Sequence, residues 1–217
     1  MKVLVIPEDS RGNDESILKP IVEAMMAEIG KPRATVKVCH DPLLGGIGEA
    51  LKWERIEEIL ELYPMIDLFL LCVDRDDEAG RATRLRELEC KSLNMLKGGR
   101  VLLAENAWQE IEVWVLAGMK NLPREWNWKD IRSERDPKEV YFRPYAQSRK
   151  LASSPGGGAK TLGQEAALNY KRICQKCPED VEHLENRTRE WLKIFESSSG
   201  GNADRAAKVH AWMHCSS

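Results

Sequence analysis

The chain has 217 residues and a mass of 24.7 kDa, and its composition is 42% hydrophobic and 31% charged. These values are typical of an ordinary soluble globular protein. No stretch approaches the ~20 apolar residues that a membrane-spanning helix needs. The short apolar segment at the N-terminus leads directly into acids, which is unlike a signal peptide. The sequence therefore predicts a cytoplasmic protein without a membrane partner.

The net charge of −2 conceals an uneven distribution along the chain. Residues 1–119 carry 15 basic and 22 acidic side chains, whereas residues 120–176 carry 13 basic and 6 acidic ones. The remaining residues, 177–217, carry 5 basic and 7 acidic ones. An acidic half followed by a basic segment fits a metal site that faces a phosphate-binding surface. Chance clustering on solvated faces is the alternative explanation.

The apolar pattern of the first 120 residues alternates between short runs, which favour strands, and helical spacing. Four strands are expected at residues 2–6, 34–39, 66–73 and 100–104. A helix is expected to begin at Asp14, and further helices are expected at 49–62, 80–96 and 110–119. This order predicts an α/β fold that is Rossmann-like, with a mostly parallel four-stranded sheet and flanking helices.

The pattern changes beyond Lys120. Residues 121–135 are rich in charge and Trp and show no clear period, and residues 153–159 are predicted to form a flexible Gly-rich loop. Helices are expected at 162–177 and 179–195, joined at Pro178 as a helical hairpin. We therefore predict an α/β catalytic domain at 1–120, a basic, mainly helical appendage at 121–196, and a flexible linker and tail at 197–217.

Acidic residues follow the strands of the predicted sheet. The first strand is followed by Glu8, the fourth ends near Glu105, and the third ends in Asp74-Arg-Asp76. Ligands of parallel sheets sit beyond the carboxyl ends of the strands. Residues two apart on a strand share a face, so Asp74 and Asp76 should point the same way. If the first and third strands are neighbours, Glu8 faces both. Such carboxylates suit a divalent cation, and a solvated strand-to-helix turn with capping acids is the alternative.

Three segments resemble the Toprim (topoisomerase–primase) superfamily, whose signature is a Glu after the first strand and an Asp-x-Asp after a later hydrophobic strand. The first two are Val3–Glu8 and Leu68–Asp76. The third, Glu110-Ile-Glu-Val-Trp-Val-Leu-Ala117, looks like the Glu-Ile-Glu-Ala-Trp-Leu-Leu-Ala motif of an uncharacterised Toprim-like family. The resemblance covers roughly residues 1–120. It departs from the family at Asp9, where the family usually has Gly. It departs again at Asp14 and Glu15, which follow Glu8 by six and seven residues where the family usually places an acid after four.

The resemblance implies metal-dependent phosphodiester chemistry. Asp74 and Asp76 would hold Mg²⁺ or Mn²⁺, and Glu8 would hold a metal or act as the general base toward a water. Glu110 or Glu112 would complete a second metal site. Residues two apart on a regular helix lie about 200° apart, so only one of the two glutamates is expected to face the site. Otherwise Glu110 is an acid at a helix N-terminus and Glu112 is exposed.

A cation near the reacting phosphate would assist this chemistry. Lys150 or Lys160 could steady the pentavalent phosphate, and a plain surface role is the alternative for both. The chain has no room for the gate domain of a topoisomerase and shows no template-binding parts of a primase. The sequence therefore predicts a hydrolase, a small Toprim-type nuclease acting on nucleic acid, with a defence or toxin-like role by family analogy alone.

The competing hypothesis is a non-catalytic nucleotide- or partner-binding subunit that keeps the Toprim fold, with its partner protein encoded nearby. The altered Glu8-Asp9 turn supports this hypothesis. A receiver-like phosphotransfer domain would need a Lys at the end of a later strand, and none stands there. The choice between DNA and RNA, and the oligomeric state, are left open by the sequence.

Overall fold

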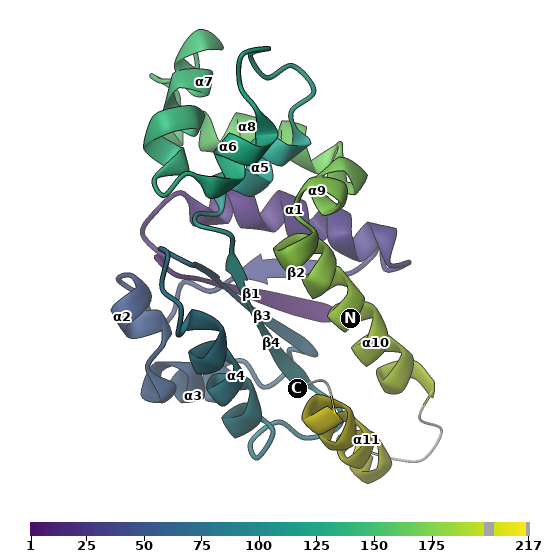
Figure 1. Cartoon of the computed structure of the whole chain (residues 1–217). Coiled ribbons are helices and arrows are strands. Elements are labelled where there is room, and N and C mark those ends of the chain that lie inside the picture. Colours follow the sequence, from purple (N-terminus) through teal and green to yellow (C-terminus); the bar gives the residue numbers. More distant parts are fainter. Residues whose placement is uncertain (198–201, 216–217) are drawn as a thin grey trace.

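A four-stranded parallel sheet forms the centre of the protein in the computed structural model, which describes residues 1–197 and 202–215 (Figure 1). The strand order is β2-β1-β3-β4, and all pairings are parallel. The strands are β1 (Lys2–Pro7), β2 (Thr35–Val38), β3 (Leu68–Asp74) and β4 (Val101–Ala107). The predicted α/β fold is confirmed, and β1 and β3 are neighbours as the candidate site requires.

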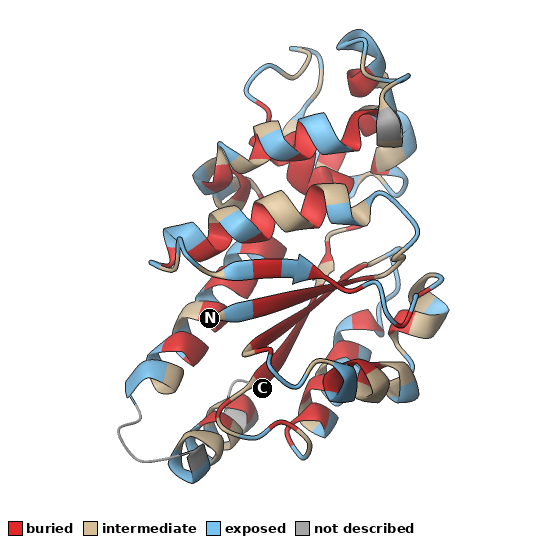
Figure 2. Ribbon diagram, turned by 180° about the vertical axis from the view of Figure 1, so that it is seen from behind, coloured by how far each residue is buried: buried red, intermediate tan, exposed pale blue. Residues whose placement is uncertain are grey.

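Helices cover both faces of this sheet, so β3 is buried on both sides (Figure 2). Val5, Leu70 and Leu103 project to one face, where they share a core with α1 (Asp14–Glu28) and α5 (Glu112–Gly118). Leu4, Phe69 and Leu102 project to the other face. Their core includes residues of three further helices, which are α2 (Ile47–Ala50), α3 (Trp53–Leu62) and α4 (Arg81–Ser92). Successive side chains along each strand thus pack into two separate hydrophobic cores.

The second half of the chain is almost entirely helical. Its elements are α6 (Trp128–Ser133), a π-helical turn (Lys138–Phe142), α7 (Arg143–Ser148), a 3₁₀ turn (Pro155–Gly158), α8 (Ala159–Ala167), α9 (Tyr170–Lys176), a second π-helical turn (Pro178–Glu182), α10 (His183–Ser197) and α11 (Asn202–Cys215). Helix α8 approaches α1 so closely that a Cβ on Gly163 would lie 2.5 Å from the backbone oxygen of Ser16. One hydrophobic core therefore runs across residue 120, where the sequence predicts a domain boundary.

Three of the predicted helices are divided or altered in the structure. The segment 49–62 is split between α2 and α3, because Lys52 is extended at the start of α3. The segment 162–177 is split after Ala167, and the segment 179–195 begins as a π-helical turn. In the predicted Gly-rich loop, Gly156, Gly157 and Gly158 all have positive φ within a 3₁₀ turn, a conformation that glycine adopts without steric cost.

Part of the predicted linker and tail is a packed helix. Helix α11 buries Val209 and Met213, and Arg86 of α4 donates to the backbone oxygen of Met213. Residues 198–201 and 216–217, the rest of that predicted segment, lie outside the described residues. Within the described ranges, no helix combines the length and the apolar character that crossing a membrane requires.

Candidate metal centre

Two carboxylates meet at the carboxyl ends of the adjacent strands β1 and β3. Asp74 is the last residue of β3, and Glu8 directly follows β1. The Oε2 atom of Glu8 accepts a hydrogen bond from the backbone N–H of Asp74 at 3.0 Å. The Oδ1 atom of Asp74 accepts one from the backbone N–H of Ile111 at 2.9 Å. The parallel pairing of these strands therefore brings together acids that are 66 residues apart.

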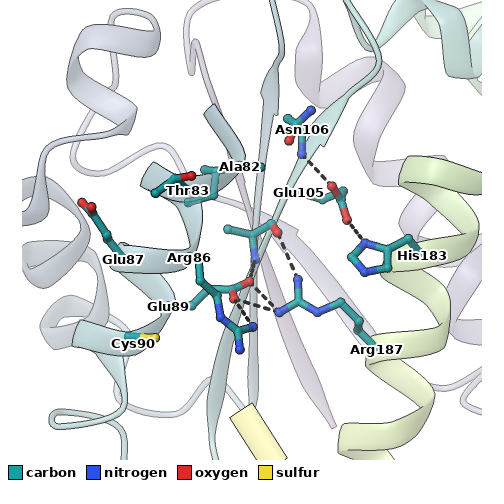
Figure 3. Close-up of a pocket in the computed structure, with 12 residues that line it drawn as sticks. Ala82, Thr83, Arg86, Glu87, Glu89, Cys90, Glu105, Asn106, His183 and Arg187 are labelled. Atoms are coloured by element: carbon teal, nitrogen blue, oxygen red, sulfur yellow. Dashed lines mark hydrogen bonds and ion pairs between the residues drawn. The ribbon is translucent and has the colours of Figure 1, made fainter. Parts of the chain in front are cut away.

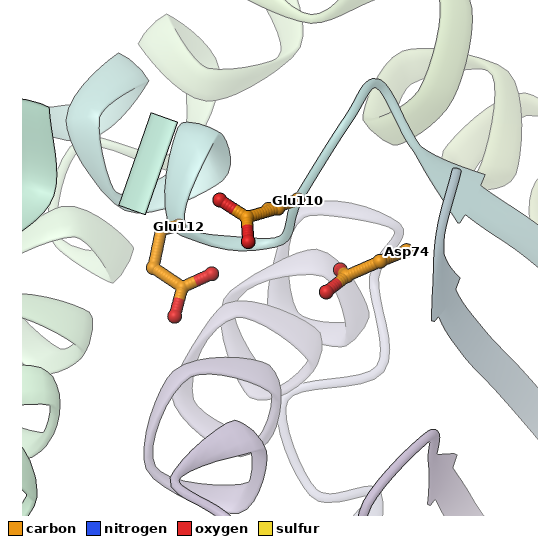
Figure 4. A group of neighbouring side chains, drawn as sticks. All are labelled: Asp74, Glu110 and Glu112. Carbon is orange, nitrogen blue, oxygen red and sulfur yellow. The ribbon is translucent and has the colours of Figure 1, made fainter. Parts of the chain in front are cut away.

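Glu110 and Glu112 both reach Asp74 (Figure 4). Carboxylate oxygens of the three residues all lie within 4.8 Å of one another. The prediction that only one glutamate could face the site was wrong, because it assumed a regular helix through both. Helix α5 begins at Glu112, and Glu110 lies in the turn before it. The separation of about 200° that holds for residues two apart on a regular helix therefore does not apply to these two side chains.

The acidic cluster formed by Asp74, Glu110 and Glu112 could hold a metal ion. Divalent cations such as Mg²⁺ and Ca²⁺ bind carboxylate oxygens at about 2.0–2.6 Å, so oxygens grouped this closely can share one ion. Glu112 is only 3% exposed, and its Oε2 atom is buried without a hydrogen-bond partner. A buried acceptor with no partner is rare in native proteins and points to a missing donor or ion. The donor set therefore fits a cation.

The electrostatics of the cluster also favour a cation. Burial raises the pKa of Asp74 well above its ordinary value, and the charges of Glu112 and Glu8 raise it further. Burial raises the pKa of Glu110 to about 7. Burial, with the charge of Glu112, raises the pKa of Asp14 to about 6. A bound cation reverses such shifts, because it favours the ionised form of every carboxylate around it.

Lys138 is the positive group at this cluster. Its Nζ atom pairs with Oε1 of Glu112 at 2.8 Å, and its backbone N–H donates to Oε2 of Glu110 at 2.7 Å. Burial lowers the pKa of the Lys138 ammonium, but the charge and hydrogen bond of Glu112, with the charges of Glu110 and Asp14, together outweigh burial, so the pKa lies above its ordinary value. No sequence motif predicts this role for Lys138. The only signal for it was the excess of basic residues in segment 120–176.

Asp14, like Lys138, is a residue near the cluster that the sequence did not assign to the site. It stands in the first turn of α1, and its Oδ2 atom accepts a hydrogen bond from the backbone N–H of Asp9 at 3.3 Å. The longer turn between Glu8 and α1 thus still returns an acid to the edge of the sheet. Spacing alone could not show this, because the path of the turn decides where Asp14 points.

Asp76 does not share a face with Asp74, which corrects the strand-based expectation. Strand β3 ends at Asp74, and Asp76 adopts a left-handed conformation with φ of 52°. Its carboxylate is half-exposed and pairs with Arg81 at 3.3 Å. Both Asp76 and Glu8 lie outside the group of three close carboxylates. Burial raises the pKa of Glu8, and the charge of Asp76 adds to this, so the two acids still interact.

The two lysines predicted near the substrate are both exposed. Lys150 follows α7 with φ of 58°, and Lys160 lies in the first turn of α8, where it borders a hollow with Glu15 and Glu23. In the part of the chain that the structure describes, neither lysine forms an ion pair with the acidic cluster. Lys138 is the lysine that pairs with this cluster, through Glu112.

Neither a protein-family model, nor a curated protein, nor a solved structure matches this chain.

Proposed function

We propose that the acidic cluster holds Mg²⁺ or Mn²⁺ and that the protein is a Toprim-type nuclease, which hydrolyses phosphodiester bonds of nucleic acid. The observation that carries this proposal is the grouping of three carboxylates within 4.8 Å, one of which, Glu112, has a buried oxygen without a hydrogen-bond partner. An all-carboxylate donor set favours these hard cations over zinc or copper. An effector role in defence, or as a toxin-like module, would follow from family analogy alone.

The residues around the cluster have distinct roles in this mechanism. A divalent cation bound there supplies a water of lowered pKa and offsets charge on the phosphoryl oxygens. Glu8 stands beside Asp74 but outside the ligand group, and its raised pKa suits a base that takes the proton of the attacking water. Lys138 places an ammonium at the same cluster, where it can contact a phosphoryl oxygen.

The competing function is a non-catalytic nucleotide- or partner-binding subunit with the same fold. The ion pair between Lys138 and Glu112 favours it, because the chain's own ammonium already offsets part of the negative charge. In this alternative the cluster is a structural ion-pair network, and no exogenous cation is needed for folding or binding.

Cleavage and metal binding by the purified protein distinguish the two functions. Labelled DNA and RNA, single- and double-stranded, are incubated with Mg²⁺, Mn²⁺ or a chelator, and Mn²⁺ binding is measured by calorimetry. We expect metal-dependent cleavage that is lost in Asp74→Asn and in Glu112→Gln. The matched control is Asp77→Asn, which neutralises an exposed acid in the same loop. Cleavage that survives when Asp74→Asn and Glu112→Gln are combined in one protein would reject the assignment. Absence of both cleavage and Mn²⁺ binding would favour the subunit.

A further inference from the structure

A groove runs beside the metal centre along the carboxyl ends of β3 and β4. It consists of two adjoining hollows of about 580 and about 320 Å³. The larger one lies between α4, β4 and α10 (Figure 3). The smaller one extends toward the loop that follows Asp74. The two hollows share Ala82, Glu105, Asn106 and His183.

His183 projects into this groove from the first position of α10. Its Nδ1 atom lies 2.6 Å from Oε2 of Glu105, which is buried on β4 (Figure 3). The hydrogen bond to Glu105 raises the pKa of His183, which favours a ring that carries protons on both nitrogens. No protein group among the described residues hydrogen-bonds to Nε2, and the side chain is about half-exposed. The ring therefore presents a donor to the groove.

A buried ion pair fixes the helix that carries His183. Arg187, one turn further along α10, forms two hydrogen bonds of 2.8 Å with the carboxylate of Glu89 on α4. Both partners also bind the backbone of Ala104 on β4 (Figure 3). A pair that is this buried and fully hydrogen-bonded holds three elements in register. The position of His183 is thus set before any ligand arrives.

Two arginines supply further donors in the smaller hollow. The guanidinium of Arg75 stacks over the ring of Trp108 at 4.0 Å, and it pairs with no carboxylate in the described ranges. The side chain of Arg81 is only 8% exposed, and its Nε atom is buried without a partner, although another nitrogen pairs with Asp76. A buried donor that lacks an acceptor calls for a partner that the protein does not supply, such as an ordered water or a ligand.

The acids that border the smaller hollow do not cancel these donors. Glu105 is committed to His183, and Glu179 is committed to Arg132 at 2.7 Å. Glu78 is exposed, and its charge opposes an anion. Among the described residues, Arg75 is therefore the cation of this hollow without a carboxylate partner. Arg81 and His183 pair with Asp76 and Glu105, but the Nε atom of Arg81 and the Nε2 atom of His183 have no hydrogen-bond partner there.

We infer that this groove binds a phosphate group of a nucleic acid strand, through Arg75, Arg81 and His183. The inference rests on the proposed function, because it supplies the subsite for a phosphate that neighbours the one at the metal centre. Arg75 directly follows Asp74 in the chain, so a strand that crosses the sheet edge passes from the cluster to the groove. The Trp108 ring holds the guanidinium of Arg75 in place at this edge.

The test measures binding without chemistry. Fluorescent single-stranded DNA and RNA oligonucleotides are titrated with the full-length protein in chelator, and anisotropy is followed at several salt concentrations. We expect Arg75→Gln and His183→Gln each to weaken binding about tenfold, and Arg75→Gln to lower the salt dependence by roughly one counterion. The matched control is Arg84→Gln, an exposed arginine on α4 outside both hollows, which should leave affinity unchanged. Circular dichroism checks that each variant is folded.

The outcomes separate this inference from the proposed function. Affinity that depends on Arg75 and His183 supports the groove even if no substrate is ever cleaved. Cleavage together with affinity that is the same in Arg75→Gln, His183→Gln and Arg84→Gln overturns the groove and leaves the nuclease standing. Absence of oligonucleotide binding in chelator also overturns it, because its donors need no metal.

Discussion

Replacing Asp74 by Asn should stabilise the metal-free protein at pH 8 and abolish its stabilisation by Mg²⁺. The amide is nearly isosteric with the carboxylate and keeps an oxygen that accepts the hydrogen bond from Ile111. It removes one charge from a buried group of acids. A residue that binds a cation is thus expected to destabilise the protein when that cation is absent.

The size of the effect follows from the geometry. Two unit charges 4.8 Å apart repel by about 3.5 kcal/mol at an effective dielectric constant of 20, and by about half of that in a wetter site. Lys138 offsets part of the charge of Glu112, and Glu110 is partly protonated near neutral pH. We therefore expect Asp74→Asn to raise the free energy of unfolding by about 1–3 kcal/mol. For a chain of this size the melting temperature should rise by roughly 2–12 °C.

The assay is thermal unfolding followed by circular dichroism at pH 8, in chelator and in Mg²⁺. A cation present at 100 times its dissociation constant should stabilise the wild-type protein by about 2.7 kcal/mol, and should leave Asp74→Asn unchanged. Asp77→Asn, an exposed neighbour, should stay within about 0.5 kcal/mol of wild type in both buffers. Destabilisation of Asp74→Asn in chelator, or an undiminished response to Mg²⁺, would refute the reasoning.

Three further predictions concern pH, packing and a buried ion pair. The pKa of Glu110 is raised to about 7, so the metal-free folded state still holds a proton that the unfolded state releases near pH 4.5. The free energy of unfolding should therefore fall by about 1 kcal/mol as the pH rises from 5 to 8, as measured by urea titrations. Gly163→Ala should cost about 1–2 kcal/mol in the same assay, because its Cβ meets the backbone oxygen of Ser16 at 2.5 Å and the clash exceeds the helix propensity gained. Glu89→Gln should cost about 3–5 kcal/mol by urea unfolding, because it leaves the charge of Arg187 buried and poorly paired.

Matched variants control the last two of these predictions. Gly48→Ala also lies in a helix, but its Cβ meets nothing within 4 Å, so its stability should not fall. Glu87→Gln lies on α4 two residues before Glu89 and is exposed, so its effect should stay within about 0.5 kcal/mol. Equal losses in a variant and its control would show that the proposed contact is not the cause. Stability that rises between pH 5 and pH 8 in chelator would contradict the assigned shift for Glu110.

The strands were predictable because their signal is local. A run such as Leu68–Val73 is apolar at every position, which favours a strand buried on both faces, and the parallel order then places Glu8 beside Asp74. The helix boundaries were less predictable. The difference between a helix that begins at residue 110 and one that begins at Glu112 is two residues, yet it decides whether both glutamates reach the cluster.

The remaining site residues depend on contacts distant in sequence. Lys138 reaches Glu112 from a segment with no clear periodicity, so only the tertiary fold shows the contact. The same holds for His183, which meets Glu105 across 78 residues. The prediction that Asp76 points the same way as Asp74 was wrong for a local reason. Asp76 has a left-handed backbone conformation, so the alternation of side chains along the strand does not extend to it. Turn geometry and long-range pairing are the two kinds of information that periodicity does not contain.

The shared core leads to a last prediction, that residues 1–120 do not fold on their own. Trp114 of α5 is 1% exposed, and its indole N–H donates to Asp180 at 2.8 Å, far beyond the predicted boundary. Removal of the later helices would also uncover α1, against which Gly163 packs, and would remove the ammonium of Lys138 from the acidic cluster. Exposure of that much apolar surface should leave the fragment aggregated or without a cooperative thermal transition, as measured by size-exclusion chromatography and circular dichroism. A monomeric fragment with a sharp transition near that of the full chain would show instead that the α/β half is an independent domain and that the helices are an appendage to it.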